Sequence, residues 1–254
     1  MLGIERPRHN GSIPEPIPEP HGILRDAVEP PEPMADDPFT LAERLALVDA
    51  ARAIADSGLI VGAAGNLSVR SDDHLLITPR SARLGRVDPA DCVAVALDDG
   101  AVSRAHQTDA EPSSETALHR AAYAATGAGA VIHTHSHFAT VLSTLVQELP
   151  AIHYVTVGFG GPVRVVPYAT FGSQELADGV AAALDGRSAA LMANHGAVVT
   201  APTIALAVEQ ALQLEWLASV YWHARVMGSP TLLDAGQLAD VAEQERLLRP
   251  SHAG

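Results

Sequence analysis

The segment Ala130-Val-Ile-His-Thr-His-Ser136 is the most informative part of the chain, because it places two histidines in a strand-like apolar run. Side chains alternate across a strand, so His133 and His135 face the same side of the sheet. A second apolar run, Ala190-Leu-Met-Ala-Asn-His-Gly196, places His195 at the end of a neighbouring strand. Three neutral ring nitrogens leave one position of a tetrahedral zinc open for substrate, which is the pattern of a catalytic site.

Each of these histidines also has a plain structural interpretation. A single histidine in an apolar stretch is usually a packed or surface residue with its hydrogen bonds satisfied. The spacing of His133 and His135 within one strand-like run, together with a third histidine in a similar run, favours a metal site, because histidine is the commonest metal ligand. Both interpretations stay open on spacing alone.

The first part of the chain differs in composition from the rest. Residues 1–38 hold nine of the 18 prolines, including Ile13-Pro-Glu-Pro-Ile-Pro-Glu-Pro20. Such a density favours extended polyproline II and predicts a flexible or semi-extended tail, with a peptide-ligand role as an alternative. Residues 39–230 are long enough for one catalytic domain with a sizeable core. Residues 231–254 form a C-terminal tail in which a short helix is expected.

Charge and composition exclude several classes of function. The formal net charge is −14, so an acidic surface argues against nucleic-acid binding. All 16 basic residues are arginine, and the chain has no lysine. A mechanism that needs a Schiff-base lysine is therefore excluded.

A cytoplasmic protein is expected from the remaining bulk features. No stretch approaches the roughly 18 uncharged apolar residues that span a membrane, and the N-terminus lacks the apolar core of a signal peptide. The single cysteine, Cys92, excludes a disulfide framework and fits a reducing compartment. It is interpreted as a buried strand residue without a chemical role.

Strand and helix patterns alternate along the chain. The capping box Thr40-Leu-Ala-Glu43 opens the first helix, and Gly58 ends it. Helices are predicted over residues 40–57, 113–125, 138–146, 173–184, 202–228 and 238–248, and strands over 65–69, 74–78, 91–97, 130–135, 163–166, 189–192 and 197–199. Many connections resemble hairpins. The pattern predicts an α/β layered domain with a mixed, largely antiparallel central sheet and helices on both faces.

The stretch Pro112-Ser-Ser-Glu115 places an acid in the first turn of a predicted helix. The helix dipole alone could account for Glu115. The free N–H groups and the hydroxyls of Ser113 and Ser114 also make an anion site. His119 lies on the same helix face as Glu115 and is interpreted as a packing residue, with a supporting role for the site as the alternative.

Two loops offer further groups for a substrate. Gly65-Asn-Leu-Ser68 combines a glycine that lets a ligand approach the backbone with Asn66 and Ser68 as donors, although Gly-Asn is also ordinary turn chemistry. Thr78-Pro-Arg-Ser81 ends a strand in a loop that carries Arg80. This arginine suits phosphate or carboxylate binding, or is a solvated loop residue.

Taken in order, these motifs resemble the class II aldolase/adducin family. The series is Gly-Asn-x-Ser, Ile-Thr-Pro, Pro-Ser-Ser-Glu, His-x-His and Asn-His-Gly, and it covers roughly residues 40–228. Pro150-Ala-Ile-His-Tyr154 and Val166-Pro-Tyr-Ala-Thr-Phe-Gly172 resemble the L-fuculose-1-phosphate aldolase branch. The resemblance implies a single three-layer α/β/α domain and a homotetramer with active sites between subunits.

The resemblance also implies the chemistry of the site. It implies one zinc per subunit on His133, His135 and His195, with Glu115 as acid/base and further ligand, and it gives Tyr154 of a neighbouring subunit the proton transfer at the aldehyde oxygen. The substrate phosphate is expected among Gly65, Asn66, Arg80, Ser81, Ser113 and Ser114. Since lysine is absent, a metal is also the electrophile that chemistry requires.

The expected activity is the reversible cleavage of a ketose 1-phosphate to dihydroxyacetone phosphate and an aldehyde. Two departures bear on the substrate: Ser81 stands where the family usually has glycine, and no counterpart of a C-terminal tyrosine follows Gly228. The alternatives are a pentulose-phosphate 4-epimerase, a sugar-acid-phosphate decarboxylase, or a non-catalytic scaffold like the adducin head. Glu115 favours aldolase or decarboxylase over epimerase, and the three histidines argue against a scaffold.

Overall fold

The computed structural model describes residues 37–103 and 108–248. The predicted Pro-rich tail therefore lies outside the described residues, apart from its last two positions. The helices are α1 (Leu41–Asp56), α2 (Thr116–Thr126), α3 (His137–Ser143), α4 (Gln174–Ala183), α5 (Ile204–Met227) and α6 (Ala235–Leu248), with short 3-10 helices η1 (Leu84–Arg86), η2 (Pro89–Asp91) and η3 (Tyr154–Phe159). The strands are β1 (Asn66–Ser71), β2 (His74–Ile77), β3 (Val93–Ala96), β4 (Ala130–Thr134), β5 (Glu148–Leu149), β6 (Val163–Val166), β7 (Ala189–Met192) and β8 (Gly196–Ala201).

Within the described residues, the eight strands form one sheet in the order β3-β2-β1-β4-β8-β7-β6-β5. Neighbouring strands pair antiparallel except β6 and β7, which are parallel. The predicted mixed, largely antiparallel sheet is confirmed. Its central pairs, β1 with β4 and β4 with β8, put the His-x-His strand in the middle of the sheet.

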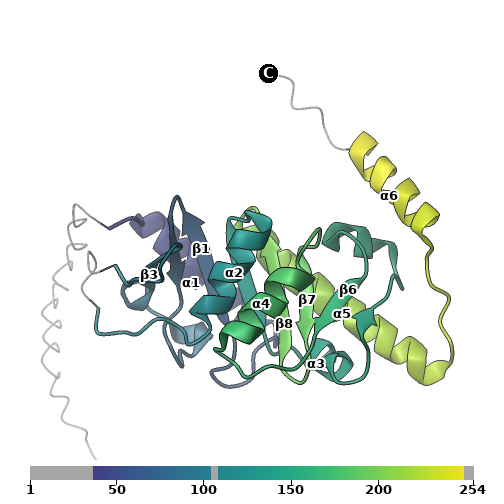
Figure 1. Ribbon diagram of the computed structural model, residues 1–254, viewed down its shortest axis with the longest axis horizontal. Helices are drawn as coiled ribbons and strands as arrows, with labels where there is room; N and C mark the ends of the chain where they lie inside the picture. The colour runs from purple at the N-terminus through teal and green to yellow at the C-terminus, as the bar shows by residue number, and fades with distance from the viewer. Residues whose placement is uncertain (1–36, 104–107, 249–254) are drawn as a thin grey trace, which may run out of the picture. The chain divides into compact units, whose positions relative to one another are not determined.

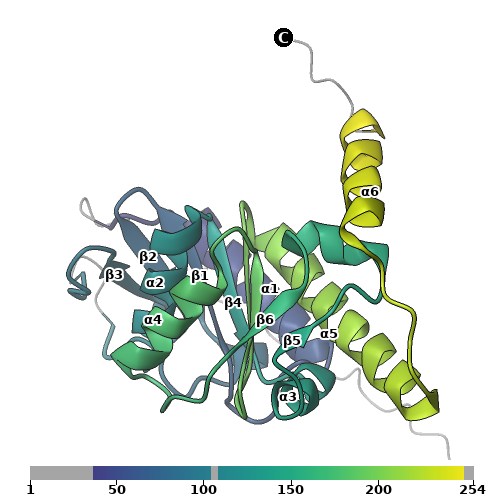
Figure 2. The ribbon, with the colours of Figure 1, turned by 45° about the vertical axis from the view of Figure 1, so that its right-hand side comes forward.

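Helices cover both faces of this sheet (Figures 1 and 2). Because side chains alternate along a strand, neighbours such as Leu75 and Leu76 belong to different hydrophobic clusters. On one face the strands pack against α1 and α5, and Leu47 and Leu217 belong to that cluster. On the other face they pack against α2 and α4. The three-layer α/β/α fold is thereby confirmed.

The start of α1 follows the predicted capping box. The Thr40 side chain accepts a hydrogen bond from the Glu43 backbone N–H, and the Glu43 carboxylate accepts one from the Thr40 N–H at 2.8 Å. Just before the helix, Asp37 makes an ion pair with the buried Arg44 at 2.8 Å. The Arg44 guanidinium also donates to the Cys92 carbonyl at 2.8 Å, which ties α1 to the segment entering β3. Cys92 itself is buried, as predicted.

The structure differs from the predicted elements at several ends. Helix α2 begins at Thr116, with Glu115 at the N-cap position and no capping side chain, so neither Ser113 nor Ser114 caps it in the expected way. Instead, the Ser113 hydroxyl accepts a hydrogen bond from the Glu115 N–H at 3.2 Å. The two-residue strand β5 and the 3-10 helix η3 were not predicted, because they are too short to show a helix or strand periodicity in the sequence. Helix α6 is present, and none of its residues is buried. Among the described helices, none is long and apolar enough to cross a membrane.

Candidate metal and substrate site

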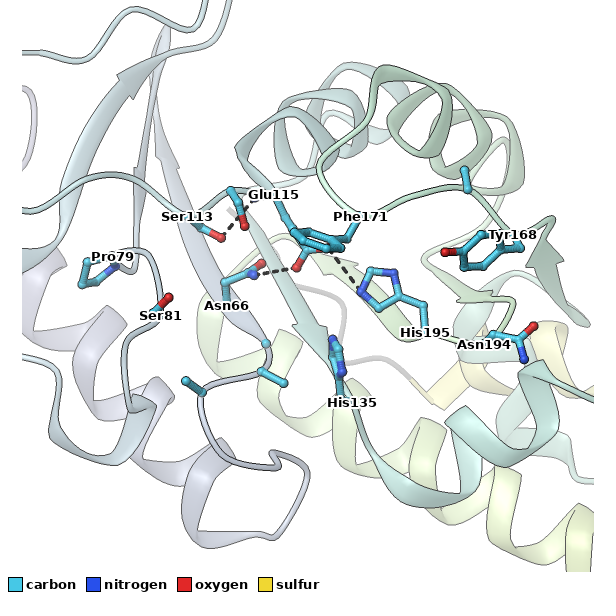
Figure 3. Close-up of a pocket in the computed structure, with 15 residues that line it drawn as sticks. Asn66, Pro79, Ser81, Ser113, Glu115, His135, Tyr168, Phe171, Asn194 and His195 are labelled. Carbon is cyan, nitrogen blue, oxygen red and sulfur yellow. Dashed lines mark hydrogen bonds and ion pairs between the residues drawn. The ribbon is translucent and has the colours of Figure 1, made fainter.

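Strand pairing brings the three predicted histidines together. His133 belongs to β4, and His135 lies just beyond its end. His195 lies in the turn between β7 and β8, next to β4, because Thr134 pairs with Ala197. The three imidazole centroids are 4.8 to 4.9 Å apart. The strand geometry therefore aims three rings at one point, as Figure 3 shows for His135 and His195.

The close approach of these segments depends on glycine. A Cβ on Gly196 would lie 2.2 Å from the Thr134 carbonyl oxygen, so any side chain there would push β8 away from β4. Gly65 has a φ of +94°, and a Cβ on it would lie 2.8 Å from the His133 carbonyl oxygen. Asn194, in the same turn as His195, has a φ of +58°, a conformation that asparagine tolerates better than most residues.

The hydrogen bonds of His133 define which ring nitrogen faces the site. Its Nδ1 lies 2.9 Å from the Ala197 carbonyl oxygen, which can only accept, so Nδ1 carries the proton. Its Nε2 therefore presents a lone pair, 3.0 Å from Nε2 of His135 and 3.2 Å from a carboxylate oxygen of Glu115. A backbone carbonyl that fixes the tautomer in this way is the usual support of a metal-ligating histidine.

Glu115 completes the group from the start of α2. It is buried, and its Oε2 accepts a hydrogen bond from Asn66 Nδ2 at 2.9 Å. Its Oε1 lies 3.3 Å from His195 Nε2 but has no hydrogen-bond partner among the described residues. Burial raises the pKa of the Glu115 carboxyl, whereas the neighbouring imidazoles of His133 and His195 and the hydrogen bond from Asn66 lower it, and the net shift is downward. The carboxylate is thus anionic at neutral pH.

These four side chains fit a divalent metal ion. One ligand atom from each of Glu115, His133, His135 and His195 lies within 4.8 Å of the others. Burial lowers the pKa of His135 to about 4 and also lowers that of His195, so both rings are neutral and offer lone pairs. Glu115 Oε1, which has no hydrogen-bond partner in the described part of the chain and lies among neutral imidazoles, is in place to bind a cation. Three imidazoles and a carboxylate suit zinc and neighbouring first-row ions.

The group opens into a cavity of about 350 Å³. The side chains that line it include Glu115, His135 and His195, the predicted phosphate-binding residues Gly65, Asn66, Ser81, Ser113 and Ser114, and the aromatic residues Tyr168 and Phe171. Figure 3 shows Ser113 and Asn66 beside Glu115, with Phe171 close by. Five of the six predicted phosphate-binding residues are thus brought to one cavity with three of the four metal-site residues.

Besides the buried His133, two predicted residues do not line this cavity. Arg80 makes an ion pair with Glu111 at 2.7 Å, and its side chain is half exposed. Tyr154 lies in η3, is 53% exposed, and does not line the cavity; its ring contacts that of His153, which in turn contacts Trp216. Its predicted role belongs to a neighbouring subunit, so its absence from the cavity of its own chain leaves that prediction open.

The structure adds three residues that the sequence had not assigned to the site. Tyr168 and Phe171 line the cavity with side chains 65% and 66% exposed. They lie in a loop without periodic pattern, and only their place in a quoted family motif marks them. Asn194 is the third, beside His195. At Ser81 the backbone has a φ of +56°, a left-handed conformation that favours the glycine expected at this position.

Comparison with known proteins places this fold and site in one family. Residues 45–222 match the class II aldolase and adducin N-terminal domain. The chain is 40% identical to the 5-methylthioribulose-1-phosphate/5-deoxyribulose-1-phosphate aldolase of Rhodospirillum rubrum over 80% of this chain and 91% of that protein. It is 35% identical to the L-fuculose phosphate aldolase of Escherichia coli over 78% of this chain and 91% of that one.

A solved structure agrees. The L-fuculose 1-phosphate aldolase superposes with a TM-score of 0.77 at 32% identity and covers 82% of this chain and 98% of its own. The chain therefore belongs to the class II aldolase and adducin N-terminal domain family. This confirms the resemblance and the enzyme class that it implied, a class II aldolase and carbon–carbon lyase.

Proposed function

We propose that this chain cleaves a ketose 1-phosphate reversibly into dihydroxyacetone phosphate and an aldehyde, with zinc as its metal. The observation that carries the proposal is the buried Glu115 carboxylate, whose Oε1 has no hydrogen-bond partner within residues 37–103 and 108–248 and lies 3.3 Å from His195 Nε2. A buried anion among lone-pair donors, opening into a cavity, suits metal-assisted chemistry better than a structural role.

The residues around the metal would divide the work. When bound by His133, His135, His195 and Glu115, zinc supplies a Lewis acid that stabilises negative charge developing on the substrate ketone. In the cleavage direction the bond between C3 and C4 breaks, and its electron pair stays with C3. Glu115 would deliver a proton to C3, and in the reverse direction remove it. The hydroxyl proton on C4 must leave as the aldehyde forms, and we assign this transfer to Tyr154 of a neighbouring subunit.

The polar side of the cavity supports binding of the phosphate. The hydroxyls of Ser113 and Ser114 and the amide of Asn66 can donate hydrogen bonds there, and Gly65 lets the ligand approach the backbone. Ser81 adds a hydroxyl at the opposite loop. Arg80 would act only if it exchanged Glu111 for the phosphate, since the two side chains are 2.7 Å apart.

The apolar side of the cavity supports a substrate whose far end carries no hydroxyl. Tyr168 and Phe171 present large apolar surfaces, and alanines 63, 64 and 169 line the same cavity. The relatives are named for substrates of this kind: a deoxy sugar, a methylthio sugar and fuculose. We propose 5-deoxyribulose and 5-methylthioribulose 1-phosphates together with a fuculose 1-phosphate as the substrate class.

The assignment of Tyr154 requires assembly, and we propose a homotetramer. The exposed apolar residues Leu206, Leu212 and Trp216 along α5, and the unburied helix α6, support an interface between copies. Light scattering is expected to give four chains per particle. A monomer at micromolar concentration would contradict both the tetramer and the role of Tyr154. The single buried thiol, Cys92, supports a reducing cytoplasmic setting.

Product analysis tests the reaction. Zinc-loaded protein is incubated with a panel of ketose 1-phosphates, and dihydroxyacetone phosphate is measured by its enzymatic reduction with NADH. Release from the deoxy and methylthio substrates is expected, with none from protein treated with a chelator. Formation of an epimer or of carbon dioxide without dihydroxyacetone phosphate would contradict the proposal. Substrates with a terminal hydroxyl show whether the apolar wall selects.

A further inference from the structure

A chain of buried hydrogen bonds runs from the metal site into the protein, away from the cavity. Asn66 Nδ2 lies 2.9 Å from Glu115 Oε2, and Asn66 Oδ1 lies 2.5 Å from His119 Nε2. On the far side of the ring, His119 Nδ1 lies 2.7 Å from Ser68 Oγ, which is 2.8 Å from the Tyr123 hydroxyl. All five side chains are at most 6% exposed, and His119 and Ser68 are completely buried.

The secondary structure explains why these residues meet. Asn66 and Ser68 are two positions apart on β1, so their side chains face the same side of the sheet. His119 and Tyr123 are four positions apart on α2, one turn above the other. Glu115 lies one further turn before His119. One face of β1 and one face of α2 thus meet along a row of polar side chains.

In this series of hydrogen bonds, the donor and the acceptor of each bond can be assigned by starting from the Glu115 carboxylate. The Glu115 carboxylate can only accept, so the amide group facing it is the NH₂ of Asn66. The Asn66 carbonyl then faces His119, so Nε2 of His119 must donate. A neutral imidazole with a proton on Nε2 has an acceptor at Nδ1, so Ser68 donates to it and accepts from Tyr123. This is the only placement of the protons in which every donor faces an acceptor.

His119 is held in the neutral form that this order requires. Burial lowers its pKa to about 3, so the ring carries one proton at neutral pH. Burial also raises the pKa of the Tyr123 hydroxyl, which keeps its proton. With the other tautomer, His119 Nε2 would accept from the Asn66 amide, and the Asn66 carbonyl would turn toward the Glu115 carboxylate. Two acceptors would then face each other in a buried site, which is costly.

We infer that His119 is a positioning residue for the reaction: its Nε2–H fixes the Asn66 amide, which holds the Glu115 carboxylate in the orientation for proton transfer at the substrate carbon. Ser68 and Tyr123 set the tautomer of His119. The inference rests on the proposed function, because the proton transfer by Glu115 belongs to it.

The tautomer can be tested without any catalytic activity. Long-range ¹H–¹⁵N spectra of the metal-free protein, labelled at histidine, are expected to show His119 with its proton on Nε2 at neutral pH. Ser68→Ala removes the donor to Nδ1 and is expected to reduce the Nε2–H population. A proton on Nδ1 in the wild type would overturn the inference, whatever the protein does with sugars.

Kinetics then tests the consequence. His119→Leu is expected to lower kcat by about 10- to 100-fold, the usual loss when a supporting residue of a metal site is removed. His119→Gln keeps one donor and one acceptor in the amide and is expected to recover most of that loss. His223→Leu, at an exposed histidine of α5 outside this series of hydrogen bonds, serves as the matched control, with an expected change below about threefold.

The outcomes separate the inference from the proposed function. Elemental analysis should give equal metal content in the variants, and thermal unfolding should show that each is folded. If His119→Gln is as impaired as His119→Leu, or if the loss appears in KM alone, His119 does not act through Glu115. If the wild type releases no dihydroxyacetone phosphate, the proposed function fails, while the tautomer result still stands or falls by itself.

Discussion

The two walls of the cavity differ in how firmly their side chains are held. The inner wall, defined here as Glu115, His135 and His195 together with the buried residues Asn66, Ser68, His119 and His133 beside and behind them, is buried or half-buried and joined by directed hydrogen bonds and close contacts. The outer wall, defined as Tyr168 and Phe171, is about two-thirds exposed. The inner wall can therefore fix the chemistry, while the outer wall is free to adapt to the part of the substrate that varies among related sugars.

Removing metal ligands from the inner wall should have the largest effect. The double variant His133→Ala/His135→Ala lacks two of four donors, and we expect it to bind no zinc and to show no detectable cleavage. Elemental analysis should give about one zinc per chain in the wild type. The exposed His223→Ala on α5 is the matched control and should keep its zinc. Full metal occupancy in the double variant would rule out these histidines as ligands.

Glu115→Gln should come next, because it removes the acid/base and leaves the three histidines. We expect turnover to fall by roughly 10²–10⁴-fold, the usual contribution of general acid–base catalysis. Proton exchange at the hydroxymethyl carbon of dihydroxyacetone phosphate, which becomes C3 of the ketose, should fall in parallel when it is followed by NMR. The exposed Glu175→Gln provides the control. Exchange at the wild-type rate in Glu115→Gln would leave Glu115 as a ligand or helix-start residue only.

Tyr154→Phe separates the second proton transfer from the first. Cleavage should slow, because the oxygen of the aldehyde fragment loses its proton partner, while exchange at C3 persists, because no aldehyde takes part in it. The two rates are measured on the same preparation. If cleavage and proton exchange slowed equally, Tyr154 would take part in the same proton transfer as Glu115, which would contradict our assignment.

A change in the outer wall should be smaller and should appear in KM. Phe171→Ala removes apolar surface from the cavity, and we expect about a tenfold rise in KM for a deoxy or methylthio substrate, equivalent to burial of part of a phenyl ring. Leu145→Ala, equally exposed but away from the cavity, is the control. A fall in kcat with unchanged KM would show that the two walls do not divide the work in this way.

The smallest effect concerns stability in acid. Because the pKa of His119 in the folded protein is about 3, the unfolded chain takes up that proton first as the pH falls from about 6.5. The stability is thus complete above pH 6.5 and decreases below it, by about 2 kcal/mol at pH 5 for this one group. Urea unfolding of the metal-free protein measures it. Glutamine does not titrate in this range, so the free energy of unfolding of His119→Gln should decrease less as the pH falls. An equal decrease in the wild type and the variant would show that His119 is not the cause.

The inner wall was largely predictable from the sequence, and the outer wall was not. His133, His135 and His195 lie in or next to apolar strand-like runs, and the alternation of side chains along a strand indicates which face His133 and His135 share. Glu115 was recognised from the motif Pro112-Ser-Ser-Glu115. The capping box at Thr40 is a local signal and was confirmed. Tyr168 and Phe171 lie in a loop, where no period indicates direction. His119 was interpreted as packing, because its partners come from β1, and only the pairing of distant segments reveals them.

The four metal-site donors come from three segments that are far apart along the chain: the start of α2, the end of β4 and the turn between β7 and β8. An ion bound by all of them would act as a cross-link between the sheet and the helix layer. Since the unfolded chain cannot offer this arrangement, each tenfold increase in free zinc above the dissociation constant would add about 1.4 kcal/mol to the free energy of unfolding. Zinc supply would then govern the lifetime of the folded enzyme as well as its turnover.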